Sequence, residues 1–136
     1  MKYSIVCDAE IIDEQFHGLS PFNLKNDVKN INEAQLNHIA ENIANELVYG
    51  PHGKTNVVIY KSKVSFKVNY SKIRCEDNVK KKGKSGGFRC IVLVDNIIHY
   101  GIILHIYSHS ETDDISKKEE NCLKKLVEAY VKEAGY

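Results

Sequence analysis

The fold of this chain is decided by residues 80–107, which read KKKGKSGGFRCIVLVDNIIHYGIILHIY. A lysine cluster and a Ser-Gly-Gly elbow lead into two apolar stretches, residues 88–94 and 97–106, which meet at Asp95-Asn96. Apolar runs of this length between turn residues predict β-strands, and an Asp-Asn pair favours a hairpin turn. We therefore expect a two-stranded β-hairpin beside a cationic loop, with His105, Tyr107 and His109 where the second strand ends.

The segments on both sides of this hairpin predict an α+β fold. Apolar residues recur at helical spacing over residues 32–49, up to a Gly-Pro stop, and Ser116 with Glu119 forms a capping box before a closing helix. A period of two over residues 56–75 predicts further strands, with Phe66 in the core, whereas residues 17–30 are predicted to be loop. The expected architecture is a small twisted antiparallel sheet of about four to five strands, with helices packed on one face.

Length and composition predict one domain over residues 1–136, long enough to bury its own core. The four cysteines are widely spaced and include no C-x-x-C pair, so they are expected to be reduced thiols. The sequence begins without a signal-peptide pattern and has no apolar run of membrane-spanning length, which predicts a cytoplasmic protein. No cofactor is expected. Metal is discounted as well, because His105 and His109 lack a third ligand at sensible spacing.

The distribution of charge is more informative than the net charge of +1. Residues 1–50 carry three lysines and eight acids, whereas residues 51–90 carry eleven Lys and Arg and only two acids. Residues 91–136 are again acidic, with five lysines and eight acids. Basic charge confined to the middle third favours a local site for a polyanion.

The stretch GKSGGFRCIVLV (residues 83–94), followed by an apolar strand and YSHSETDDIS (residues 107–116) before a helix, resembles the RelE/HigB-like toxins of bacterial type II toxin–antitoxin modules. Those proteins, part of the RelE/ParE superfamily, share a lysine-rich stretch, a Ser-Gly-aromatic-Arg turn and a strand ending near a tyrosine. The resemblance covers about residues 72–130, and residues 1–30 match poorly.

The resemblance implies a RelE-like fold and an endoribonuclease that cuts mRNA, commonly on the ribosome, without a metal. It also implies a cognate antitoxin that wraps the toxin or covers its basic face. On the motif, Lys80, Lys82 and Lys84 fall in the basic loop, Arg89 is the motif arginine, and Tyr107 is the tyrosine at the strand end. His109 stands where related sequences often carry lysine, which is a departure from the pattern.

The residue types suit cleavage of RNA by its own 2′-hydroxyl, which needs a base, a cation for the phosphorane and an acid. Arg89 fits the cation because a guanidinium stays charged and can bind phosphate through two parallel hydrogen bonds. His105, Tyr107 and His109 are the candidates for proton transfer. The residues expected to bind RNA are Lys72, Arg74, Lys80, Lys81, Lys82 and Lys84.

Plainer interpretations stay open for each of these residues. A lysine run is as often a solvated loop, and His105 is as often an ordinary sheet histidine. Two other functions also use the same basic loop: a non-enzymatic module that binds RNA or the ribosome, and a ParE-like toxin that poisons gyrase.

The parity of the hairpin provides a geometric test. With a two-residue turn at Asp95-Asn96, Arg89 lies on the Ile102 side, away from His105 and Tyr107. A three-residue loop or a bulge reverses the parity and brings Arg89 to their face. The RNA-cleavage hypothesis needs the second arrangement.

Overall fold

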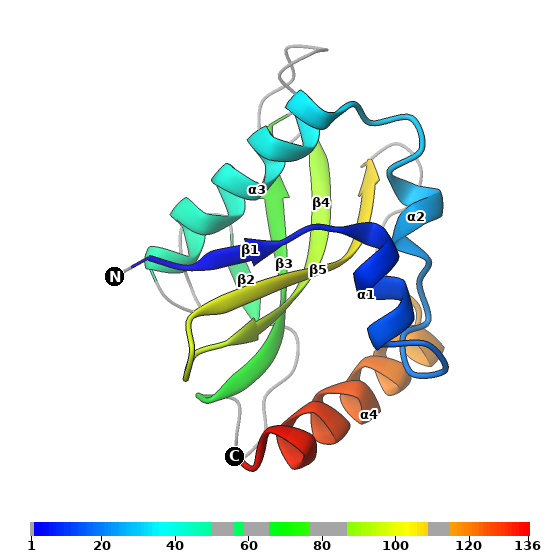
Figure 1. The fold of residues 1–136 in the computed structure, drawn as a ribbon, viewed down its shortest axis with the longest axis vertical. Coiled ribbons are helices and arrows are strands. Elements are labelled where there is room, and N and C mark those ends of the chain that lie inside the picture. The colour runs from blue at the N-terminus through cyan, green and yellow to red at the C-terminus, as the bar shows by residue number, and fades with distance from the viewer. Residues whose placement is uncertain (1, 50–55, 59–65, 77–86, 109–114) are drawn as a thin grey trace.

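In the computed structural model the described residues are 2–49, 56–58, 66–76, 87–108 and 115–136, and they form helices and strands in α+β order (Figure 1). In chain order the elements are β1 (Ser4–Val6), α1 (Ala9–Gln15), α2 (Leu24–Asp27), α3 (Glu33–Val48), β2 (Asn56–Val58), β3 (Val68–Cys75), β4 (Phe88–Asp95), β5 (Tyr100–Ser108) and α4 (Lys117–Ala134). The predicted fold class, a small sheet with helices packed on it, is confirmed.

All five described strands join one sheet in the order β1-β5-β4-β3-β2. The ladders from β2 to β5 are antiparallel, as predicted, whereas β1 runs parallel to β5. No hairpin links β1 to β5, so no tight turn imposes an antiparallel direction on that pair. The sheet is therefore mixed, with β1 as a parallel strand at the edge next to β5.

Helices cover both faces of the sheet, so the expectation of helices on one face is wrong. A Cβ atom on Gly101 would lie 3.0 Å from Cδ1 of Leu47, which places α3 over the face of Gly101 and its partner Val94. Asp95 points to the opposite face, where its carboxylate accepts a hydrogen bond from Tyr130 of α4. Burial on both faces explains why β4 is apolar almost throughout rather than alternating.

Both long helices begin where their sequence signals predict. Asn32 caps α3 and Ser116 caps α4, each with a reciprocal bond from the residue three positions on. Gly135 ends α4 in the left-handed conformation that glycine tolerates best. These two helices are confirmed; α3 is one residue shorter at each end than predicted, and α4 begins directly after Ser116.

Three local predictions are wrong. The segment predicted as loop contains the four-residue helix α2, which is too short to show helical periodicity. The second apolar stretch enters the sheet only at Tyr100, because residues 96–99 form the turn before it. Phe66 is 69% exposed rather than in the core, since β3 starts two residues later, at Val68.

The four cysteines are free thiols. Cys75 and Cys90 are fully buried on neighbouring strands, with their sulfur atoms 4.0 Å apart. The hydrogen bond with Cys75, together with burial, raises the pKa of the Cys90 thiol well above its ordinary value. A buried thiol that resists ionisation is a poor nucleophile, so this pair belongs to the core.

Candidate functional site

Arg89, His105 and Tyr107 lie on the same face of the sheet. Arg89 pairs with Tyr107 in the β4–β5 ladder, and Ile91 pairs with His105. Residues directly opposite one another in an antiparallel ladder point to the same face, and so do residues two apart on one strand. The arrangement required by the RNA-cleavage hypothesis is therefore present.

A β-bulge produces this arrangement. The connection between the strands is four residues long, since Asp95 pairs with Tyr100, and a four-residue connection keeps the parity of a two-residue turn. The register then shifts, because Val92 pairs with Ile103 whereas Ile91 pairs with His105. Leu104 is the extra residue. Because of it, His105 and Tyr107 lie on the face opposite to the one they would have without a bulge.

The neighbouring strand β3 adds two basic residues to this face. Arg74 is directly opposite Arg89, and Lys72 is opposite Ile91. Arg74 is exposed and Lys72 is half-buried, whereas Arg89 and Tyr107 are only 5% and 3% exposed. Of the predicted site residues on this face, Lys72, Arg74 and His105 are therefore accessible to a ligand. Arg89 and Tyr107 are buried.

The remaining predicted site residues, Lys80, Lys81, Lys82, Lys84 and His109, lie outside the described residues. Their roles stay predictions.

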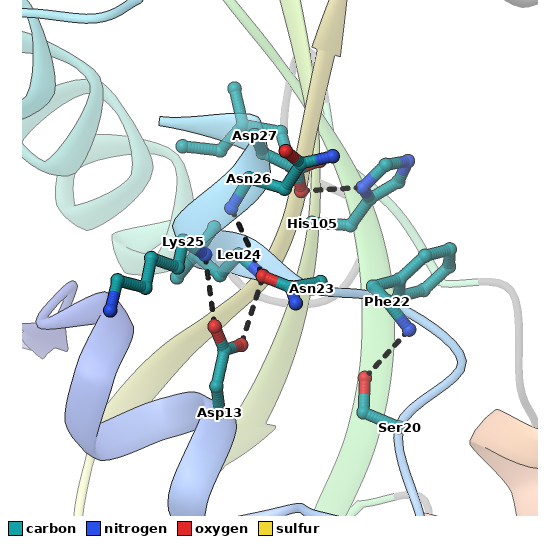
Figure 2. Close-up of polar contacts among 10 residues, drawn as sticks. Asp13, Ser20, Phe22, Asn23, Leu24, Lys25, Asn26, Asp27 and His105 are labelled. Carbon is teal, nitrogen blue, oxygen red and sulfur yellow. Dashed lines mark hydrogen bonds and ion pairs between the residues drawn. The ribbon is translucent and has the colours of Figure 1, made fainter. Parts of the chain in front are cut away.

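His105 is held by a carboxylate and by two aromatic rings. Its Nδ1 lies 2.7 Å from Oδ2 of Asp27, and the same oxygen accepts the backbone N–H of Ile106 at 3.1 Å (Figure 2). Its ring stacks on Phe22 at 4.1 Å with the two planes 1° apart, and on Tyr107 at 4.9 Å. The histidine is therefore oriented by a carboxylate and two aromatic rings.

Asp27 and Phe22 come from a segment whose shape is fixed by its own polar side chains. Both carboxylate oxygens of Asp13 in α1 accept backbone N–H groups at the start of α2, from Leu24 and Lys25 at 2.9 Å each. Asn23 caps the same helix by accepting the N–H of Asn26 (Figure 2). A short helix has no stability of its own, so these bonds supply it.

The sequence did not reveal Asp27 or Phe22 as part of the site, because each meets His105 across about 80 residues of chain. One local signal was present, because asparagine, the residue type at position 23, is favoured at the N-cap of a helix. That signal predicts a helical turn at residues 23–27, but not what the turn contacts.

The site lies at the end of the sheet away from α4. Figure 1 shows β5 ending at the top of the molecule beside α2, whereas α4 runs along the bottom. Three cationic side chains, a histidine fixed by a carboxylate and a tyrosine can together hold an anion and move a proton. Among the described residues, no group of three or more His, Cys, Asp or Glu side chains is placed to hold a metal ion.

A pocket of about 270 Å³ lies elsewhere, between α1 and the second half of α4. Its charged lining group is Glu133, and the hydroxyl of Tyr130 in its wall already donates to Asp95. Of the described residues that line it, none is a histidine or a basic side chain that could hold a phosphate, so we place the candidate site at His105. Of the helices that the structure describes, none is long and apolar enough to cross a membrane.

No family model matches this chain, and neither the curated proteins nor the solved structures include one that matches it.

Proposed function

We propose that this protein is a metal-independent endoribonuclease, in which His105 moves a proton of RNA and the basic side chains beside it hold the scissile phosphate. The observation that carries the proposal is the shared face of Arg74, Arg89 and His105, together with the close carboxylate partner of the histidine. A carboxylate at this distance orients the imidazole, which is what a proton-transfer group requires.

In the proposed reaction, His105 takes the proton from a ribose 2′-hydroxyl, and the 2′-oxygen attacks the neighbouring phosphorus. The bond from phosphorus to the 5′-oxygen breaks, and that oxygen leaves with a proton supplied by His109 or by water, because Tyr107 is buried beneath the site. The products are a 2′,3′-cyclic phosphate and a 5′-hydroxyl. Lys72 and Arg74 bind the non-bridging oxygens.

Arg89 contributes from beneath the surface. Its guanidinium stays charged at every pH of interest, and its side chain is only 5% exposed. A fixed positive charge under the site favours the extra negative charge of the phosphorane, even without direct contact. This role replaces the direct phosphate clamp that the sequence predicted.

The biological role we propose follows the sequence resemblance: a toxin that cuts mRNA in the cytoplasm, on the ribosome, and is held inactive by a cognate antitoxin. An antitoxin that covered the face of Arg74 and His105 would block the proposed site. The second candidate, a module that binds RNA without cutting it, is favoured by the burial of Tyr107.

The test uses purified protein with a DNA strand that contains a single ribonucleotide, in the presence of a chelator. We expect cleavage at that position, a 2′,3′-cyclic phosphate by mass spectrometry, and no cleavage when the 2′-hydroxyl is absent. His105→Gln should lower the rate about 100-fold or more. The matched control is His17→Gln, at an exposed histidine that follows α1.

Expression in a bacterial host separates the alternatives. Growth arrest with loss of mRNA supports the toxin proposal. Growth arrest with intact mRNA contradicts it and favours the gyrase-poisoning class. Binding of RNA by purified protein without cleavage on or off the ribosome leaves the binding module as the better explanation.

A further inference from the structure

The geometry points to Asp27 as the positioning residue that makes Nε2 of His105 the proton-transfer atom of the site. This inference rests on the proposed function, because it assigns an orienting group to that reaction. The position of the ring hydrogen of His105, on Nδ1 or on Nε2, can also be measured without any substrate.

The contacts of one carboxylate oxygen determine where the hydrogens lie. Oδ2 of Asp27 accepts the backbone N–H of Ile106 at 3.1 Å and lies 2.7 Å from Nδ1 of His105. An ionised carboxylate only accepts hydrogen bonds, so Nδ1 has to supply the hydrogen of the shorter contact. A neutral imidazole carries a single N–H, and its lone pair is therefore on Nε2.

The orientation of the ring is fixed by the contact with Asp27 and by two stacks. A half turn would point Cδ2 instead of Nδ1 at Asp27 and lose the 2.7 Å contact, and intermediate angles would break the stacks on Phe22 at 4.1 Å and on Tyr107 at 4.9 Å. Figure 2 shows the second ring nitrogen on the side away from Asp27. The nitrogen with the lone pair is thus the one that faces away from the protein carboxylate and is available to a ligand.

Asp27 is itself held in place from behind. It is the last residue of α2, whose first turn is held by the two backbone amides bound to Asp13 and by the cap at Asn23. Its bond to the N–H of Ile106 also joins α2 directly to β5. Because the Asp27 side chain is already held in place, it loses little conformational entropy when it orients the histidine.

Replacement of Asp27 by Ala tests this assignment, because it removes the oxygen that accepts the hydrogen of Nδ1. Asp27→Asn is the conservative variant, since its amide oxygen can take the place of Oδ2 and accept from both Nδ1 and the N–H of Ile106, which should keep the wild-type tautomer. In Asp27→Ala no acceptor holds the hydrogen on Nδ1, and a neutral imidazole then carries it mostly on Nε2. The atom that should accept the proton of the 2′-hydroxyl then carries a hydrogen instead of a lone pair.

The experiment records ¹⁵N chemical shifts of the His105 ring, with cleavage of the single-ribonucleotide strand measured in parallel. We expect wild type to show a protonated Nδ1 and a bare Nε2 at neutral charge, Asp27→Asn to keep that tautomer, and Asp27→Ala to carry its ring hydrogen mostly on Nε2. Cleavage by Asp27→Ala should fall about 100-fold or more, as for other histidines that lose an orienting carboxylate. KM should change little, because Asp27 does not touch the substrate.

The matched control is Asp8→Ala, which removes a carboxylate that caps α1 by accepting the N–H of Ile11. We expect it to leave the tautomer of His105 unchanged. The inference is overturned if wild type carries its ring hydrogen on Nε2, if Asp8→Ala changes the tautomer as much as Asp27→Ala, or if Asp27→Ala moves the hydrogen to Nε2 and still cleaves at the wild-type rate. A wild type that cleaves RNA neither alone nor on the ribosome contradicts the proposed function and the proton-transfer role together, whereas the ring measurement separately decides whether Asp27 sets the tautomer.

Discussion

At the scale of single residues, Asp95 shows how one buried carboxylate can organise a whole end of the molecule. Its side chain is fully buried, yet it accepts four hydrogen bonds. Two come from the backbone N–H groups of Ile97 and Ile98, and two come from the hydroxyls of Tyr130 and Tyr136 at 2.7 Å each. Burial of this carboxylate is tolerated because four donors are directed at its two oxygens.

Asp95→Ala should therefore destabilise the protein by about 3 kcal/mol, because it leaves several donors without their acceptor. Urea unfolding at neutral pH measures the effect. Tyr136→Phe is the comparison, since it removes one of the four bonds and should cost about 1 kcal/mol or less. If Asp95→Ala costs no more than Tyr136→Phe, the carboxylate does not organise this end of the sheet.

At the scale of elements, the two ends of α4 are stabilised by different interactions: a capping box at its start and hydrogen bonds to Asp95 at its end. Its start is capped by Ser116, and its last turns are bound to the β4–β5 turn through the two tyrosines on Asp95. Burial, followed by the hydrogen bond to Asp95, raises the pKa of Tyr130 far above the ordinary tyrosine value. The hydrogen bond to the same carboxylate also raises the pKa of Tyr136.

These shifts predict a loss of stability at alkaline pH. Above about pH 10 a tyrosine in the unfolded chain loses its proton, whereas Tyr130 in the folded protein keeps it. The unfolded state then binds fewer protons, so the free energy of unfolding falls as the pH rises. Urea unfolding from about pH 8 to about pH 11 should show this fall in wild type and a shallower one in Tyr130→Phe. Tyr49→Phe, at a 73% exposed tyrosine, should leave the slope unchanged, and an equal slope in all three proteins would contradict the linkage.

The elements also show how far sequence can predict this structure. Helices α3 and α4 were predictable because periodicity and capping boxes are local signals. The bulge at Leu104 was not, because residues 101–107 are nearly all apolar and any register buries them. The partners of His105 were not predictable either, since Asp27 reaches it through a contact between distant parts of the chain. The sequence thus predicted a site with the histidine and the basic residues, and it did not predict the segment that contacts the histidine.

At the scale of the whole molecule, the basic side chains of the candidate site and the Asp95 cluster lie at opposite ends of the sheet. Lys72, Arg74 and Arg89 lie toward the end where β5 finishes, whereas the Asp95 cluster lies at the other end with the last turns of α4. A field of this kind attracts a polyanion to one end. RNA binding should therefore be sensitive to charge at the His105 end and insensitive at the α4 end.

Arg74→Glu tests this polarity, because Arg74 is exposed and its side chain shares a face with His105. Its loss should weaken binding of single-stranded RNA and lower the slope of log K against log salt by about 1, the value expected for one lost phosphate contact. Fluorescence anisotropy over a range of salt concentrations measures both quantities. The matched control, Lys132→Glu, makes the same change of charge at an exposed position in the last turn of α4. Equal losses in the two variants would mean that RNA responds to net charge alone, whereas a loss confined to Arg74→Glu places the contact at the His105 end.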